Sequence, residues 1–296
     1  MVVQHNLQAM NSNRMLNVNT ASQAKSTEKL SSGYKINRAA DDAAGLAISE
    51  KMRRQVRGLT QASANAEDGI SCVQTAEGAL NEVHDMLQRI NELAVKGENG
   101  TLTTADRGYI ASEVQQLMSE IDRVQCTTTF NEQKLLNGDF SEGVGLQVGA
   151  EANQHIAISI NKMSVDKIFS KYTNGAGTEA TDGYSAIATK FYGLNKDNPQ
   201  VTSTDFASLN QITKAALNVV SKQRSDLGAV QNRLEHTIKN LDNVVENTTS
   251  AESAIRDTDM ATEMVKFANN NILAQAGQAM LAQANQSNQG VLSLLG

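Results

Sequence analysis

Apolar side chains recur every seven residues through a long segment, from about residue 43 to residue 96. Two rows run side by side at this spacing. One row is Met52, Leu59, Ala66, Val73, Leu80, Leu87 and Ala94, and the other is Ile48, Ala62, Ala76, Val83 and Ile90. A sevenfold repeat of this length predicts a helix with a coiled-coil-like seam. Such a helix is roughly 80 Å long, longer than a compact globule of this chain length is wide, so we expect an elongated protein.

A glycine-containing loop follows this first long helix. Gly97 and Gly100 can end the helix, and Thr103 or Thr104 can cap the next one. The second helix is predicted to run to about Val124. Its apolar face comprises Ile110, Val114, Leu117 and Ile121. Because the connecting loop is short, we expect the two helices to be antiparallel neighbours.

The period of the pattern changes to two between residues 127 and 161. The stretches GLQVGA and HIAISI alternate, and EANQ between them can turn the chain. The alternation predicts a β-hairpin with Ile156, Ile158 and Ile160 on one face. Residues 161–203, which hold the lone Pro199, are predicted to form a short irregular insertion with two short helices.

A second long helical seam begins near Thr204. One row of sevens is Val220, Leu227, Leu234, Leu241 and Ile255, interrupted at Thr248, with Val230 and Val244 on a companion row. This seam can lie against the first one, although the two are far apart in the sequence. The chain is therefore expected to fold back on itself.

The two ends of the chain are almost free of charge. Residues 1–24 carry only Arg14, with His5 as a second candidate, and residues 267–296 contain no Asp, Glu, Lys, Arg or His. Their Ala, Gln, Leu and Met content favours helix, but single helices of this kind are marginal in water. We expect both ends to be buried against each other and against copies from other chains, and the closing stretch, residues 267–296, to be disordered in the monomer and helical in the polymer.

Composition excludes several other classes of protein. The net charge is -6 and basic residues are not interleaved with aromatic ones, so nucleic acid is not an expected partner. About 18 consecutive apolar residues, the length needed to span a membrane, occur nowhere. The first residues show no basic leader followed by an apolar stretch, so export by the general secretory route is not expected.

Four stretches of the sequence resemble bacterial flagellin in the order that this family has them. They are STEKLSSGYKINRAADDAAGLAISEKMRRQVRGLTQASANAEDGIS, LNEVHDMLQRINELAVKGENGT, SKQRSDLGAVQNRLEHTIKNL and the closing QAMLAQANQSNQGVLSLLG. The resemblance implies an extracellular subunit of the flagellar filament, in which paired terminal helices line the core. It implies an inner domain of residues 1–42 with 256–296, a rod domain of residues 43–160 with 204–255, and a short variable outer insert at 161–203.

The resemblance also implies partners. They are other copies of the chain in a helical homopolymer, the type III export apparatus with its export chaperone, and the filament cap and hook-junction proteins. We expect the polymer contacts to be made by apolar residues of the two ends: Leu7, Met10, Leu16, Ile272, Leu273, Met280, Leu281, Leu292 and Leu295. The alternative is that these residues form the ordinary core of a helical bundle, but such a bundle normally has a charged solvent face.

Many flagellins are recognised by toll-like receptor 5 through the rod domain. The resemblance assigns this surface to Gln88, Arg89, Glu92 and Leu93 in QRINELAV, together with Glu113 on the following helix. The alternative is that Arg89 and Glu113 form a solvated ion pair, which contributes little. Asn91 stands where the family frequently has Arg, a departure that affects the expected affinity.

Candidate chemistry is otherwise sparse. Cys72 and Cys126 could lie near each other in the helical hairpin, but a small buried hydrophobe is the favoured interpretation of Cys72. The four histidines form no HExxH motif, and Asp41 and Asp42 are expected to cap a helix or face solvent rather than hold a metal. No enzyme and no cofactor are predicted. The alternatives to a filament subunit are a hook–filament junction protein, and an adhesin or immune-modulating surface protein.

Overall fold

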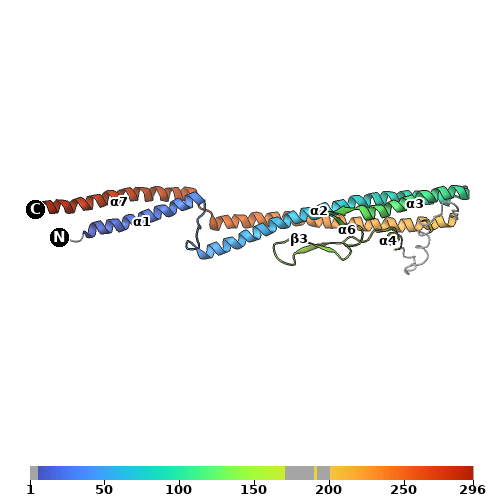
Figure 1. Ribbon diagram of the computed structural model, residues 1–296, viewed down its shortest axis with the longest axis horizontal. Helices are drawn as coiled ribbons and strands as arrows, with labels where there is room; N and C mark the ends of the chain where they lie inside the picture. Colours follow the sequence, from blue (N-terminus) through green and yellow to red (C-terminus); the bar gives the residue numbers. More distant parts are fainter. Residues whose placement is uncertain (1–5, 171–189, 192–200, 296) are drawn as a thin grey trace. The chain divides into compact units, whose positions relative to one another are not determined.

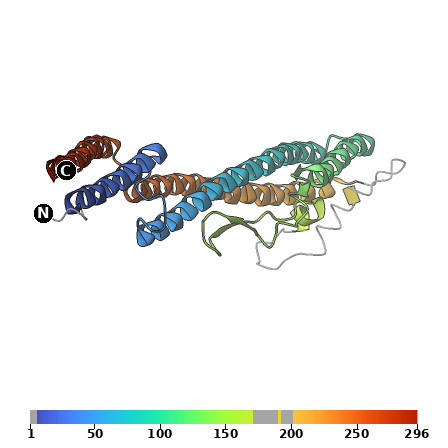
Figure 2. The same ribbon diagram turned by 60° about the vertical axis from the view of Figure 1, so that its left-hand side comes forward.

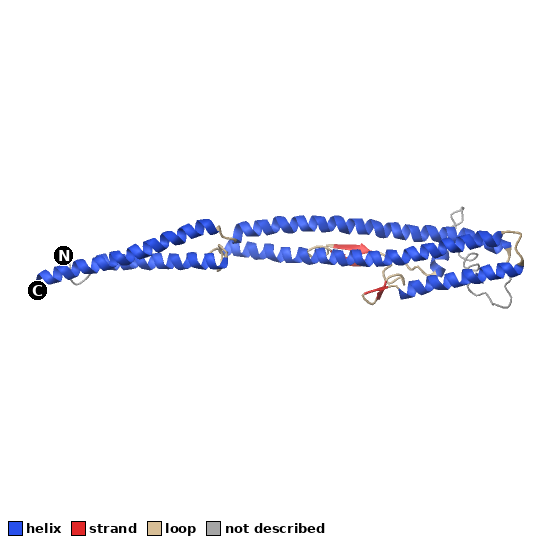
Figure 3. Cartoon of the chain, turned by 90° about the horizontal axis from the view of Figure 1, so that it is seen from above, coloured by secondary structure: helices blue, strands red, loops and turns tan. Residues whose placement is uncertain are grey.

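A computed structural model describes residues 6–170, 190–191 and 201–295 of the chain, and within these ranges the side chains up to residue 286 except that of Ser170. The fold is mainly α-helical, with long helices at both ends and two small antiparallel sheets (Figure 3). The fold class predicted from the sequence is thereby confirmed. The chain divides into two compact units: residues 1–57 with 244–296, called unit 1, and residues 58–243, called unit 2.

The core of unit 2 is built from three long helices. They are α2 (Ala43–Glu98), α3 (Thr104–Thr127) and α6 (Ser203–Arg256), which lie side by side in Figures 1 and 2. Their rows of sevens face inward, as the sequence predicts. Fully buried members include Val73, Leu80, Leu87 and Ile90 of α2, Val114 and Ile121 of α3, and Val220, Leu227 and Leu234 of α6.

One member of the predicted rows departs from the pattern. Ile48 is 48% exposed, whereas its neighbour Ser49 is fully buried. The face that α2 buries is therefore displaced by one residue near the beginning of the helix.

The helix α3 is capped by Thr103, one of the two threonines predicted for this role. Thr103 forms a capping box with Asp106, because each side chain accepts a hydrogen bond from the other residue's backbone N–H.

The predicted hairpin is present. Strands β3 (Val144–Gln147) and β4 (His155–Ile158) pair antiparallel, with Val144 opposite Ile158 and Gln147 opposite His155. Ile156, Ile158 and Ile160 point into the core and are at most 8% exposed. The face assigned from the alternation is therefore the buried one.

A second, smaller hairpin was not predicted. Strands β1 (Thr129–Phe130) and β2 (Gln133–Lys134) pair antiparallel, and the two turn residues Asn131 and Glu132 have positive φ angles of 47° and 65°. Helix α4 (Val165–Ser170) follows the sheets. Most of the predicted insertion, residues 171–189 and 192–200, lies outside the described residues.

The two cysteines are not paired. Both thiols are free, with Cys72 buried and Cys126 exposed. Burial also raises the pKa of the Cys72 thiol. Cys72 is thus the small buried hydrophobe that the sequence favoured.

Unit 1 contains α1 (Leu7–Ser32) and α7 (Met260–Leu295), with the beginning of α1 and the end of α7 at the same end of the pair (Figure 1). Helix α1 ends at Gly33, whose φ of 77° is readily adopted only by a residue without a side chain. The linker back to α2 is held by Asp41, which accepts hydrogen bonds from the backbone N–H groups of Asn37 and Arg38. Asp42 accepts from the N–H of Gly45, so it caps α2.

Acid is expected to loosen this linker. The hydrogen bond from Lys25, whose Nζ lies 2.8 Å from Asp41 Oδ1, and the backbone donors lower the pKa of Asp41 to about 2. A carboxylate whose folded pKa lies below its ordinary value stabilises the fold above that value and stops doing so as the pH falls through the folded pKa. The amide resonances of Asn37 and Arg38 should therefore titrate together with a midpoint near 2. A midpoint near 4, the ordinary value for an aspartate, would contradict this, and Asp41→Asn should abolish the transition.

Candidate functional site

The paired helices α1 and α7 have an unusual interior. Among the described side chains, those that the two helices bury are small or polar: Ser26, Glu263, Ala274 and Ala284 are all at most 7% exposed. Hydrogen bonds join the two helices at separate points along their length. Asn6 Nδ2 donates to the carbonyl oxygen of Ala284 at 3.0 Å, and Asn270 Nδ2 donates to Ser22 Oγ at 3.2 Å. Little apolar area is removed from water inside this pair.

The large apolar side chains of the pair point outward instead. Leu7 is 70% exposed, Met10 64%, Ile272 64%, Leu273 49% and Met280 58%. These are five of the residues predicted to make polymer contacts. Burying such a side chain stabilises a structure by about 1.5–3 kcal/mol, so the pair by itself leaves a substantial driving force for association unused.

The remaining predicted contacts are placed differently. Leu16 and Leu281 are partly buried. A Cβ added at Gly277 would lie 3.3 Å from Leu16 Cδ1, so the glycine gives this leucine room. Leu292 and Leu295 belong to α7, but their side chains are beyond the described ones.

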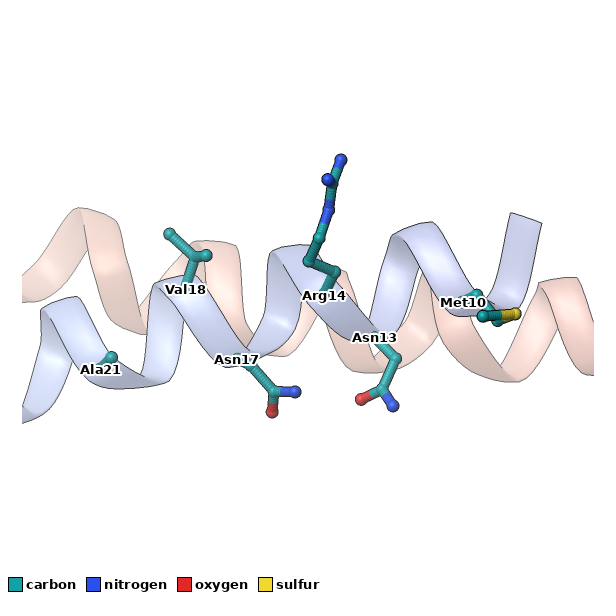
Figure 4. A pocket seen from close by; sticks show the side chains of 6 residues that line it. All are labelled: Met10, Asn13, Arg14, Asn17, Val18 and Ala21. Atoms are coloured by element: carbon teal, nitrogen blue, oxygen red, sulfur yellow. The ribbon is translucent and has the colours of Figure 1, made fainter. Parts of the chain in front are cut away.

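A shallow groove follows one side of α1 within this surface. It has a volume of about 460 Å³ and is lined by Met10, Asn13, Arg14, Asn17, Val18 and Ala21. In the view of Figure 4, the side chains of Arg14 and Val18 point up from this part of α1, and those of Asn13 and Asn17 point down. The guanidinium of Arg14 donates a hydrogen bond to Asn11 Oδ1 within its own helix. The apolar surface of α1 is thus open along this groove.

A polar layer interrupts the pair near one end. Ser26 Oγ donates to Glu263 Oε1 at 2.8 Å, and Lys266 Nζ lies 3.3 Å from Glu263 Oε2. Burial would raise the pKa of the Glu263 carboxyl, but the contacts with Ser26 and Lys266 outweigh this and hold the pKa below its ordinary value. A single buried polar contact is a known way to fix the register of two helices whose apolar contacts are permissive.

Sequence reasoning missed several residues of this surface. Met15, Val18, Met264 and Val265 are each more than half exposed and extend the apolar face beyond the predicted set. The low charge of the ends was the available signal, but it marks a segment and not a face. The buried Glu263 carried no signal of its own, because a glutamate at that point in a helix is ordinarily solvated.

The residues assigned to a receptor surface lie together on α2 and α3 in unit 2. Arg89 Nη2 lies 2.9 Å from Glu113 Oε1, and Arg89 Nη1 lies 3.0 Å from Glu92 Oε2. The side chains of Arg89 and Glu113 are about half exposed and that of Glu92 is 67% exposed, and Gln88 is exposed beside them. Leu93 is only 2% exposed and packs in the core, so the exposed part of this cluster is polar.

Other kinds of site are not found in the described part of the chain. No three His, Cys, Asp or Glu side chains there come together as metal ligands. None of the described helices is both long enough and apolar enough to cross a membrane.

Known proteins resemble this chain over its whole length. The bacterial flagellin N-terminal helical region matches residues 3–141, and the C-terminal helical region matches residues 210–295. A flagellin of Halalkalibacterium halodurans is 50% identical over 295 residues, and one of Bacillus subtilis is 48% identical over 306 residues. A flagellar filament core protein of Treponema maltophilum is 46% identical over 304 residues. Each of the three alignments covers 100% of both chains. Together with the long helices that the two matched regions form, these similarities show that the chain belongs to the bacterial flagellin family.

Proposed function

We propose that this chain is the structural subunit of an extracellular flagellar filament that drives swimming. The observation that carries the proposal is the distribution of polar and apolar side chains in the α1–α7 pair. The pair buries the polar Ser26 and Glu263 but exposes the apolar Met10, Ile272 and Met280. A face of this kind needs further copies to cover it. The names of the relatives, flagellin and flagellar filament core protein, support the same assignment.

In this proposal each part of the chain has a mechanical role. Residues 1–42 with 256–296 form the inner domain at the filament core. Residues 43–160 with 204–255 form the rod, whose long packed helices resist bending, and residues 161–203 form a short outer insert. Contacts between unlike surfaces of successive copies generate open helical filaments rather than closed rings. No enzymatic step is part of the proposal, and the export apparatus, its chaperone, the cap and the hook-junction proteins are its expected partners.

Electron microscopy of the purified protein tests the proposal. After seeding or salting-out, we expect long filaments of uniform width. A hook–filament junction protein would give only short rings, and an adhesin would stay monomeric, so either of these results would refute the assignment. Limited proteolysis adds a second criterion, because ends that resist protease before polymerisation would argue against their ordering at subunit contacts.

Recognition by toll-like receptor 5 is a second proposed property, and it rests on the Arg89 cluster. The guanidinium is planar, has five donors and is already held by Glu92 and Glu113, so it is preorganised for a polar interface. The binding surface would consist of Gln88, Arg89, Glu92 and Glu113, with Leu93 supporting it from the core.

Substitution of Arg89 measures this property. Arg89→Ala is expected to weaken receptor binding by roughly tenfold or more, because it removes the central cation and leaves two carboxylates unpaired. Arg89→Lys should recover only part of the affinity, since an ammonium cannot hold two carboxylates in the same fork geometry. Titration of immobilised receptor with monomeric variants gives the affinities. Wild-type affinity in Arg89→Ala would reject the site.

A further inference from the structure

A basic groove runs along α6 in unit 2. It has a volume of about 810 Å³, within the range of protein binding clefts. One wall is formed by the loop before α4, by α4 itself and by Ser141, and the other wall is formed by α6. The lining of the groove includes Asn161, Lys162, Lys167, Lys222, Gln223 and Asp226.

The floor of this groove is fixed by a buried glutamine. Gln223 is 3% exposed and donates from Nε2 to the carbonyl oxygen of Ser159 at 3.0 Å. Its Oε1 accepts from Asn161 Nδ2 at 2.7 Å. Both the oxygen and the nitrogen of the Gln223 side-chain amide thus bind the loop to α6. The groove is therefore preformed and does not need a ligand to organise it.

The rim of the groove is positively charged. Lys162, Lys167 and Lys222 are exposed and line it, against the single carboxylate of Asp226. Among the described side chains, Lys162 and Lys222 have no ion-pair partner. About two turns before Lys222 in α6, Lys214 is also exposed and has no ion-pair partner among the described residues. An occupant that carries negative charge would satisfy this rim.

The free face of α2 carries the complementary charge. Residues 58–88 contain no Lys or Arg. Their exposed acidic residues are Glu67, Asp68, Glu82 and Asp85, none of which has an ion-pair partner among the described residues. They lie on the side of the helix opposite the buried Val73 and Leu80, so the face points away from the core that α2 shares with α6. Glu77, which lies nearer that core, is the acid that pairs within the chain, with Arg224 at 3.7 Å.

We propose that the α6 groove of one copy receives the acidic free face of α2 from a second copy. The inference rests on the proposed function and names the surface through which neighbouring subunits pair. Within the described part of one chain, none of the four exposed acids of α2 forms an ion pair with Lys162 or Lys222 of the groove. The groove and the acidic face make a contact between unlike surfaces, which extends into an open array instead of closing into a dimer. A helix laid in a groove is a common mode of recognition, and complementary charge raises the rate of encounter.

Charge reversal on each side separately tests the contact. The acid-reversed variant carries Glu82→Lys and Asp85→Lys, and the groove-reversed variant carries Lys162→Glu and Lys222→Glu. Each variant alone is expected to elongate wild-type seeds at least about tenfold more slowly at low salt, because like charges then face each other. An equimolar mixture of the two variants should recover the rate, since each supplies the charge that the other lacks. The chain with all four reversals should elongate its own seeds.

A matched control and the wild type separate the possible failures. Glu82→Asp with Asp85→Glu alters the same two side chains but keeps their charge, and should elongate as the wild type does. Elongation is followed by light scattering, and helical content by circular dichroism. If the wild type elongates and either reversed variant keeps its rate, or if the mixture fails to recover, the groove contact is refuted and the filament function stands. A wild type that never forms filaments refutes the proposed function itself.

Discussion

The Ile272→Glu, Met280→Glu double variant is expected to form no filaments while unit 2 remains folded. Both side chains are more than half exposed on the outer face of α7. If that face is covered by neighbouring copies, each substitution places a carboxylate in a contact from which water is excluded. An unpaired buried charge costs several kcal/mol, and residues 267–296 contain no cation that could pair with it.

Two measurements separate loss of assembly from loss of folding. Sedimentation after seeding reports the polymer, and the helical signal of circular dichroism reports α2, α3 and α6. A matched control replaces the same residues with glutamine, which removes apolar area but adds no charge, so it should weaken assembly without abolishing it. Filaments of normal length from the glutamate variant would show that this face of α7 is not a subunit contact.

The rows of sevens predicted the core of unit 2 well, because their chemistry is local. A seam of Val, Leu and Ile at fixed spacing has one way to be buried, and Val73, Leu80 and Leu87 are all fully buried. The row containing Met52 and Leu59 keeps its phase, but the companion row does not extend to Ile48. A straight helix has 3.6 residues per turn, so a strict repeat of seven drifts around it, and Ser49 takes the inner position. The pattern gives the phase of a helix but not the residue at which the phase changes.

Other features could not be read from the sequence because they depend on contacts between distant segments. Glu132 adopts a left-handed conformation that a glutamate rarely favours, so the β1–β2 turn gave no signal such as Asn-Gly. The buried contact between Ser26 and Glu263 joins residues at opposite ends of the sequence. The exposed faces of α1 and α7 also depend on such contacts. The sequence shows that these ends carry little charge, but which of their residues point outward depends on how the two helices pair.

The largest loss of stability in unit 2 is expected from Phe206→Ala. Phe206 is fully buried near the start of α6 and stacks edge-to-face on Phe191, with ring centroids 5.2 Å apart. Truncating a buried phenylalanine typically costs about 3–5 kcal/mol. The lost aromatic contact adds to that cost here. Denaturant unfolding of the monomer, followed by circular dichroism, gives the change in unfolding free energy.

The same ring explains why α2 has a glycine in its last turn. A Cβ added at Gly97 would lie 2.5 Å from Phe206 Cδ1, closer than real contacts permit. Gly97→Ala should therefore destabilise unit 2 by about 1–3 kcal/mol. Gly78→Ala is the matched control, because nothing lies within 4 Å of its added Cβ, and alanine there should stabilise the helix by about 0.5–1 kcal/mol.

The costs of Gly97→Ala and Phe206→Ala should be strongly non-additive when the two substitutions are combined. The alanine at position 97 has no aromatic ring to clash with once Phe206 is removed. Additive costs would mean that Gly97 is not kept small by Phe206.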